Sequence, residues 1–279
     1  MITGNGTEND PYIVNTYSDL VTTAAEAGKF VRIGENINIT DEFPGGDMPQ
    51  LVVNAEVDGR NKIISNWYCT TDQDMIVIDD DTSNNTARIK GLSFFNILAT
   101  LGTKSFIKVG TRLNEYTFEN CKFKGIVNGS FATAIGITGA DRVRVFSNCA
   151  FDVLCKGAYN TFSKTDLRNC YIRIERANES ASAILYSSNI TNSYVEAYTT
   201  TGKFADTYDT DCLQNNSALE IHTTQTETIK GGDMDLSIFN STYAPNYSAS
   251  QTSGDLIAAV TDSNWLNIPY LSSIGFNAG

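Results

Sequence analysis

The chain has 279 residues, of which 41% are hydrophobic and 19% charged, and its formal net charge is −12. This length allows one large domain or two small ones. The acidic balance disfavours a nucleic-acid partner, because affinity for phosphates comes mainly from Lys and Arg. The sequence contains no apolar run of about 18 residues, so we expect no membrane insertion. Helix formers are few, whereas Asn, Thr, Ser and Gly are abundant, as in many extracellular and viral β proteins.

The N-terminal segment predicts a short helix that plugs one end of the fold. The opening stretch MITGNGTENDPYIV has neither a basic nor an apolar region, so we expect no signal peptide, and release with a virus particle is one route out of the cell. Ser18 is a candidate N-cap for a helix over residues 19–27, and Gly28 would end it. The apolar side of this helix would consist of Leu20, Val21, Ala24, Ala25 and Ala27.

Strand candidates follow the helix. FVRI at 30–33 and INIT at 37–40 would begin a coil of strands, and Asp58-Gly59 predicts a turn within the stretch that comes next.

An asparagine recurs along most of the remaining chain, in contexts such as FENCKF and FSNCAF. The spacings are 30, 24, 28, 21, 23, 24 and 24 residues, between anchors at Asn66, Asn96, Asn120, Asn148, Asn169, Asn192, Asn216 and Asn240. Around the anchors the residue types repeat. The position two before is apolar in seven of eight rungs, the position three after is apolar from Phe123 onward, and the position four after is charged in the middle rungs. This alternation is typical of strands with one buried and one solvated face.

A period of 21–30 residues with strand alternation favours a solenoid. The leucine-rich-repeat pattern is absent, and a propeller blade would need about 40 residues. We therefore predict an all-β fold, a right-handed single-stranded parallel β-helix, in which each anchor Asn takes left-handed backbone angles at a bend and bonds to the Asn of the next rung. Cys121, Cys149 and Cys170 share the column after the anchor, where other rungs have Ser or Ile, so we predict buried, reduced thiols.

The C-terminal segment differs in composition from the repeats. Residues 246–255 are a polar linker, 255–260 (DLIAAV) a strand candidate, and the tail that follows contains Trp265, Tyr270, Leu271, Ile274 and Phe276. Such an aromatic tail is expected to cover the end of the coil or to dock on another chain. The predicted organisation is a cap at 1–29, a parallel β-helix at 30–245, and a linker with a capping or docking tail at 246–279.

Both ends resemble a known family. GTENDPYIV (6–14), followed by a helix beginning SDL, resembles the start of many pectate-lyase-like β-helix proteins of Gram-positive bacteria and their phages. VTDSNWLNIPYLSSIGF (260–276) resembles a tail module of such proteins, including phage structural proteins. The resemblance implies the fold, and because these families include lyases, glycoside hydrolases, adhesins and inert virion parts, it does not select an activity.

Catalytic candidates are sparse. Glu196 and Glu220 are adjacent in the charged column, and carboxylates one or two rungs apart suit retaining or inverting glycoside hydrolysis. The same column also contains Lys124, Asp152 and Arg173, so a cross-rung charge ladder explains both acids equally simply. We expect the polygalacturonase motifs NTD, DD, GHG and RIK to be missing. The single histidine, His222, has no defined partner for acid–base chemistry.

The sequence also allows two further kinds of site, a metal site and a sugar-binding surface. Asp206, Asp209 and Asp211 have a spacing that could bind Ca²⁺, as could the acids at 79–81, although surface loops explain both clusters and no cofactor is predicted. Tyr171 and Tyr194 share a column two after the anchor, where an outward pair could stack on sugar rings.

These observations favour a non-enzymatic protein of the phage virion, such as an appendage, fibre or decoration protein. The alternative is a polysaccharide depolymerase of tailspike type. A third hypothesis is a secreted adhesin. Expected partners are other virion proteins, through the tail, and a surface polysaccharide; a homotrimer is also open. The expected location is the virion, or otherwise the extracellular space.

Overall fold

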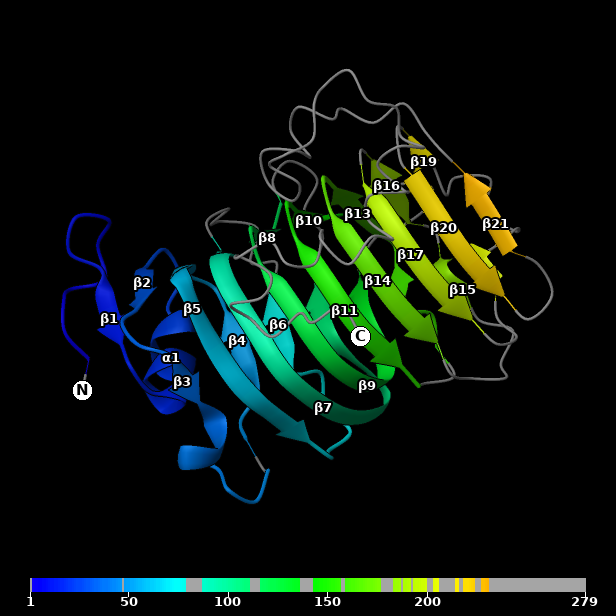
Figure 1. Ribbon diagram of the computed structural model, residues 1–279. Helices are drawn as coiled ribbons and strands as arrows, with labels where there is room; N and C mark the ends of the chain where they lie inside the picture. Colours follow the sequence, from blue (N-terminus) through cyan, green and yellow to red (C-terminus); the bar gives the residue numbers. More distant parts are fainter. Residues whose placement is uncertain are drawn as a thin grey trace.

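The computed structural model describes residues 2–46, 48–78, 87–110, 116–135, 143–156, 159–176, 183–186, 188–191, 193–199, 203–205, 214–215, 218–223 and 227–230. Almost all regular structure in these residues is strand, hydrogen-bonded into one continuous 21-stranded sheet. The strands stack in parallel, rung upon rung, and form a right-handed parallel β-helix as predicted (Figure 1). The predicted linker and tail at 246–279 lie outside the described residues.

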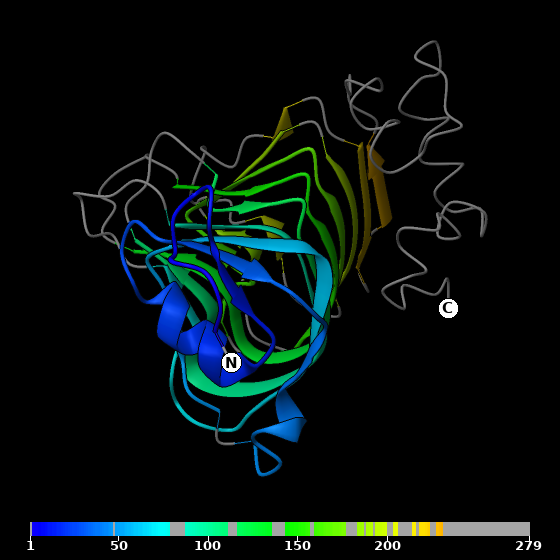
Figure 2. The ribbon, with the colours of Figure 1, turned by 90° about the vertical axis from the view of Figure 1, so that its left-hand side faces the viewer.

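Each rung of the coil has three faces (Figure 2). The first face consists of β1 (Tyr12–Val14), β2 (Phe30–Ile33), the start of β5 (Glu56–Cys69), the start of β7 (Arg88–Val109), β8 (Phe118–Glu119), β10 (Val143–Ser147), β13 (Thr165–Arg168), β16 (Asn189–Thr191) and β19 (Gln214–Asn215). The second face consists of β3 (Ile37–Asn38), the later part of β5, the middle of β7, the start of β9 (Lys122–Ala134), β11 (Ala150–Cys155), β14 (Tyr171–Arg176), β17 (Tyr194–Thr199) and β20 (Ala218–Thr223). The third face consists of β4 (Leu51–Val53), β6 (Ile76–Ile78), the ends of β7 and β9, β12 (Phe162–Ser163), β15 (Ala183–Tyr186) and β18 (Lys203–Ala205).

The predicted columns are confirmed for the rungs from Phe118 to Thr223, and the rung of Asn240 lies outside the described residues. Phe118 pairs with Phe146, which pairs with Leu167 and so on to Gln214. Phe123 begins a second column that runs in register to Leu219. The pairing of Tyr194 with Ala218 also confirms Asn216 as the anchor of its rung.

The register predicted for the first two anchors is wrong. Ile89, not Phe94, stacks on Phe118, and Phe94 stacks on Phe123 instead. The position above Asn120 is therefore Gly91, which has a left-handed φ of 58°. Glycine reaches this backbone region at no steric cost, so a search for asparagine alone passes over it.

Asparagine nevertheless takes the predicted left-handed angles at the bends, while the predicted amide bonds between rungs are seen for Asn66 and Asn96. Asn120, Asn148 and Asn169 have φ of 53–55°, the left-handed region that Asn tolerates better than most residues. Asn66 and Asn96 are also left-handed, but at a second bend a few residues further along each rung, within the second face, where the β7–β9 pairing shifts register between Phe94 and Ile97. There the Nδ2 of Asn66 donates to the Oδ1 of Asn38 at 2.7 Å, and the Nδ2 of Asn96 donates to the Oδ1 of Asn66.

The N-terminal helix exists, with different bounds from those predicted. Helix α1 (Tyr17–Ala24) is capped by Thr16, whose side chain accepts a hydrogen bond from the Asp19 N–H, rather than by Ser18. Only part of the predicted apolar side is buried, because the helix ends before Ala25. Buried Tyr17 packs edge-on against Trp67, with ring centroids 5.5 Å apart, so α1 covers the N-terminal end of the core.

Two smaller elements complete this end. Strand β1 precedes α1 and pairs in parallel with β2, so the sheet begins ahead of the helix. The 3-10 helix η1 (Ile39–Asp41) replaces the second half of the predicted strand at 37–40. At the other end, β21 (Glu227–Lys230) pairs antiparallel with β20.

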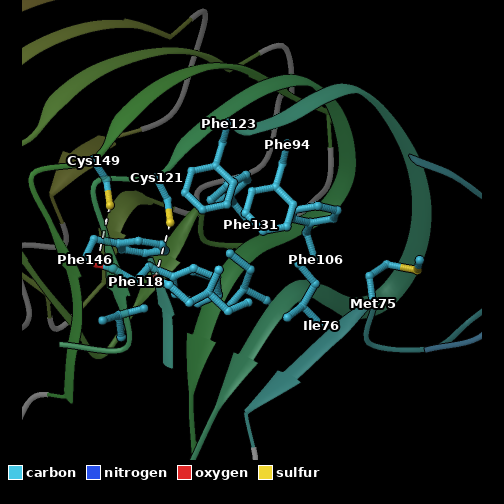
Figure 3. Packing of buried hydrophobic residues seen from close by; sticks show 14 of the residues in the cluster. Met75, Ile76, Phe94, Phe106, Phe118, Cys121, Phe123, Phe131, Phe146 and Cys149 are labelled. Carbon is cyan, nitrogen blue, oxygen red and sulfur yellow. Dashed lines mark hydrogen bonds between the residues drawn. The ribbon is translucent and has the colours of Figure 1, made fainter. Parts of the chain in front are cut away.

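The interior is a stack of phenylalanines (Figure 3). The second face contributes Phe94, Phe123 and Phe151, whose rings lie nearly parallel with centroids 4.8 and 5.2 Å apart. Phe118 and Phe146 approach them from the first face. The third face adds Phe106, Phe131 and Phe162. Burial of each such ring stabilises the fold by roughly 1.5–3 kcal/mol, so the rungs hold together through side chains as well as strand hydrogen bonds.

The cysteines that follow the anchors are buried and free, as predicted. Each thiol donates to the main-chain oxygen two residues earlier, at 3.3 Å for Cys121, 3.3 Å for Cys149 and 3.2 Å for Cys170. Ser193, on the next rung, makes the same bond through its hydroxyl at 2.9 Å. The column therefore selects small donors, which explains why Cys and Ser exchange there.

Candidate functional site

In the described part of the coil, candidate sites lie on the outer surface, because buried side chains fill the interior. The predicted charged column is confirmed as a register: Lys124, Asp152, Arg173, Glu196 and Glu220 pair in that order. The Nζ of Lys124 and the Oδ2 of Asp152 form an ion pair at 3.3 Å. Glu196 and Glu220 are direct neighbours, but their side chains lie outside the described part of the chain, so catalysis by this pair stays a prediction.

A second set of charges lies on the first face near the N-terminal end. Glu56 accepts hydrogen bonds from Arg88 at 2.7 Å and from Lys90 at 2.9 Å. These two cations hold the pKa of Glu56 below its usual value, against the opposing effect of burial. Arg88-Ile89-Lys90 does spell one of the polygalacturonase tripeptides, but both of its cations are engaged by Glu56, as in a structural ion pair.

The best-developed cluster of ionisable groups on the outer face surrounds Asp166. The Tyr116 hydroxyl donates to its Oδ2 at 3.4 Å, across the intervening rung that carries Arg144. Arg144 pairs with Asp166 in strand register, and Arg168 lies two residues further along the same strand. The half-buried Asp166 and Tyr116 thus lie beside two exposed arginines.

Burial dominates the electrostatics of this cluster. It raises the pKa of Asp166 above its ordinary value, although Tyr116 and the two arginines oppose the shift. It likewise raises the pKa of Tyr116, and the nearby Asp166 carboxylate adds to that effect. Displaced pKa values of this kind concentrate at functional sites. Chemically, Asp166 could exchange a proton with a ligand while an arginine binds a carboxylate or phosphate group.

The prediction that Tyr171 and Tyr194 form an outward pair that stacks on sugar rings is wrong for Tyr171. Its side chain is fully buried, as are Lys122 and Ala150 in the same column. A ring without exposed surface cannot stack on a sugar. Tyr194 is its neighbour in register, but the side chain of Tyr194 lies outside the described part.

Lys122 is the unexpected member of that column. It is 4% exposed, and burial lowers its pKa to about 7. Sequence alternation places it outward, where a lysine is expected to be solvated, and nothing in its local sequence signals burial.

Most residues of the other predicted sites lie outside the part of the chain that the structure describes. Asp206, Asp209 and Asp211, and the acids at 79–81, are not among the described residues. Within the described ranges no group of three or more His, Cys, Asp or Glu side chains could hold a metal ion. His222 pairs with Tyr198 in strand register. No helix among these residues has the length and apolar character needed to cross a bilayer.

Sequence reasoning missed the Asp166 cluster because its members do not share a column offset. Tyr116 and Arg144 lie four residues before their anchors, and Asp166 lies three before, with a bulge between Arg144 and Phe146 in the pairing. A search for ionisable side chains three or four positions before the anchor would have found Tyr116, Arg144 and Asp166.

Fold and outer-face columns together define a parallel β-solenoid protein. No family model and no curated protein matches the chain. Among solved structures it is similar to a Bacteroides ovatus protein provisionally described as an immunoglobulin A1 protease, with a TM-score of 0.53 over 81% of this chain and 80% of that one. The two sequences are 15% identical, so the likeness concerns the fold alone.

Proposed function

We propose that the chain is a non-enzymatic structural protein of a bacteriophage particle, a fibre, appendage or decoration protein that contacts glycans of the host surface. The observation that carries the proposal is the uninterrupted parallel stacking of rungs from β1 to β20, with an interior of stacked rings. Such a stack is a stiff spacer whose faces can present many equivalent positions.

Two further observations support it. Ion pairs on the outer surface connect neighbouring rungs and stabilise the stack. Examples are Lys124 with Asp152 and Glu56 with Arg88. The sequence at both ends resembles phage structural proteins of pectate-lyase-like fold. In this proposal the C-terminal tail docks on other virion proteins or on further copies of the chain.

The test is to look for the protein in particles. Phage particles induced from a strain that carries the gene are purified by density and analysed by mass spectrometry. We expect peptides of this chain at a fixed ratio to the major capsid protein, and their loss when residues 255–279 are deleted. Recovery of the intact chain only from the particle-free fraction would contradict the proposal.

One observation favours the alternative, a polysaccharide depolymerase. Asp166, with its raised pKa, lies beside Tyr116 and two arginines, an arrangement that could cleave an acidic polysaccharide. Incubation with capsular or wall glycans tests it. New reducing or unsaturated ends that disappear in Asp166→Asn, and persist in Glu119→Gln on the same face, would replace the structural proposal with the enzymatic one.

A further inference from the structure

A row of apolar side chains crosses the outer surface of the second face. Tyr68, Leu98, Ile126 and Leu154 are neighbours in strand register on four successive rungs. Their chain neighbours Ile97, Ala99 and Val127 are buried, so the four side chains point outward. Leu98 is 49% exposed and the other three are half-exposed. We refer to these four residues as the Leu98 strip.

Neutral hydrogen-bonding groups border one end of the strip. The amides of Asn38, Asn66 and Asn96 form a ladder across three rungs. The Tyr68 hydroxyl accepts a hydrogen bond from the Nδ2 of Asn96 at 2.9 Å, which ties the ladder to the strip. Asn96 is exposed, and it lies in the register shift between Phe94 and Ile97, where β9 has no residue directly paired with it.

Two of the charges beside the strip are paired with each other, and a third, Glu175, follows Leu154 in register and bounds the strip on the next rung. Lys124 and Asp152 lie two residues before Ile126 and Leu154, and they neutralise each other at 3.3 Å. Between Tyr68 and Leu154 the strip itself therefore offers apolar contact, amide and hydroxyl groups, and no charged side chain. A pyranose ring has the matching character, with an apolar face of C–H groups and a rim of neutral hydroxyls. Three strand steps of ~4.8 Å make the strip ~14 Å long, which suits a chain of sugars better than a single one.

We propose that the Leu98 strip, together with the amide of Asn96, binds an uncharged polysaccharide along the axis of the coil. The inference rests on the proposed function, because it assigns the glycan contact to a place on the surface. Leu98 and Ile126 would contact the faces of successive sugars, while the amide of Asn96 exchanges hydrogen bonds with their hydroxyls.

The experiment is affinity electrophoresis of the full chain in gels containing dextran, glucomannan or hydroxyethyl cellulose, with alginate as the anionic comparison. We expect retardation by at least one uncharged polymer and little by alginate. Leu98→Asp is expected to weaken retardation at least tenfold, because it places a charge in the middle of the strip. Ser147→Asp, which adds the same charge on the first face, is the matched control and should bind as the parent does. Circular dichroism confirms that both variants are folded.

Either of two binding results would overturn the inference: no retardation by any uncharged polymer, or equal binding by the parent and Leu98→Asp. A dimer in sedimentation that Leu98→Asp dissociates would also overturn it, because the strip would then be a contact between copies of the chain. Incorporation into particles is measured for the same variants. Normal incorporation without polysaccharide binding rejects the strip alone, whereas binding by a chain that is absent from particles rejects the virion proposal alone.

Discussion

The Cys149 thiol donates to the main-chain oxygen of Phe118, 3.5 Å away on the preceding rung, as well as to Ser147 on its own rung. The Ser188 hydroxyl makes the same two kinds of contact, to Phe162 and to Tyr186. Cys121 and Cys170 make the same cross-rung contact, to Ile89 and Phe146, so a small donor just before a strand joins two rungs at these four positions.

This relationship predicts how the column tolerates substitution. Cys149→Ser retains a donor of similar size, so we expect the free energy of unfolding to change by less than about 1 kcal/mol. Cys149→Ala removes the donor and leaves a small void, which should cost about 1–2 kcal/mol. Urea denaturation of both variants measures the difference. A larger loss for Ser than for Ala would show that the site selects an apolar group and not a donor.

The cysteines are expected to remain reduced throughout. Burial raises the pKa of the Cys149 thiol, so little thiolate is available to begin oxidation. A thiol titration of the denatured protein should return all six cysteines of the sequence as free sulfhydryls. In the folded protein the reaction should be slow, because the described cysteines are buried. A count of four would mean that one disulfide has formed.

The corner between the first and second faces predicts a contrast between two glycines. A Cβ on Gly91 would meet Asn61 and the main chain of Arg60 at ordinary distances, the nearest 3.6 Å, and the left-handed φ suits Asn. Gly91→Asn should therefore change stability by less than about 1 kcal/mol. A Cβ on Gly125 would overlap the main chain of Ile97, so Gly125→Asn should cost about 3 kcal/mol or more. Thermal unfolding compares them, and equal losses would contradict the assigned corner.

Glu56 predicts a loss of stability in acid. Its pKa is lowered in the folded protein by Lys90 and Arg88, so its ion pairs stabilise the fold above the unfolded value of 4.5. That stabilisation is lost as the pH falls through the lower folded value. Glu56→Gln should thus be less stable than the parent at pH 7, by about 1 kcal/mol or less since the pair is partly solvated. The gap should close below pH 4 in denaturation experiments, and a gap that persists there would assign the loss to packing.

Lys122 predicts a rise of stability with pH as well, but at neutral to basic pH. Its folded pKa of about 7 lies below the ordinary 10.5, so between these values the unfolded chain binds more protons than the folded chain. Stability contributed by this group is therefore lowest below pH 7 and rises as the pH increases. Lys122→Met should remove this rise, measured as the difference between variant and parent from pH 6.5 to 8.5. Lys124→Met on the same strand serves as the control, and a similar change in both would refute the assignment.

The sequence predicted the columns from residue 118 onward because each rung there repeats the same spacing around its bend. It failed for the earlier rungs at a particular place. Asn66 and Asn96 resemble the later anchors in their local context, yet they occupy a second bend, and Gly91 occupies the first. Both residue types reach left-handed angles, so the local pattern does not distinguish the bends; only the pairing of whole strands does.

The amino-acid sequence by itself determined the class of fold, the small buried column after each anchor and the adjacency of Glu196 and Glu220, since all three follow from strand alternation within one period. The tertiary structure alone decided which outward positions meet solvent. Tyr171 and Lys122 alternate outward and are buried, whereas Leu98 is apolar and exposed. Exposure depends on what packs over a position from elsewhere in the chain, and a period of 21–30 residues contains no information about that cover. The groups around Asp166 are likewise brought together by stacking across rungs and a bulge, not by their spacing along the chain.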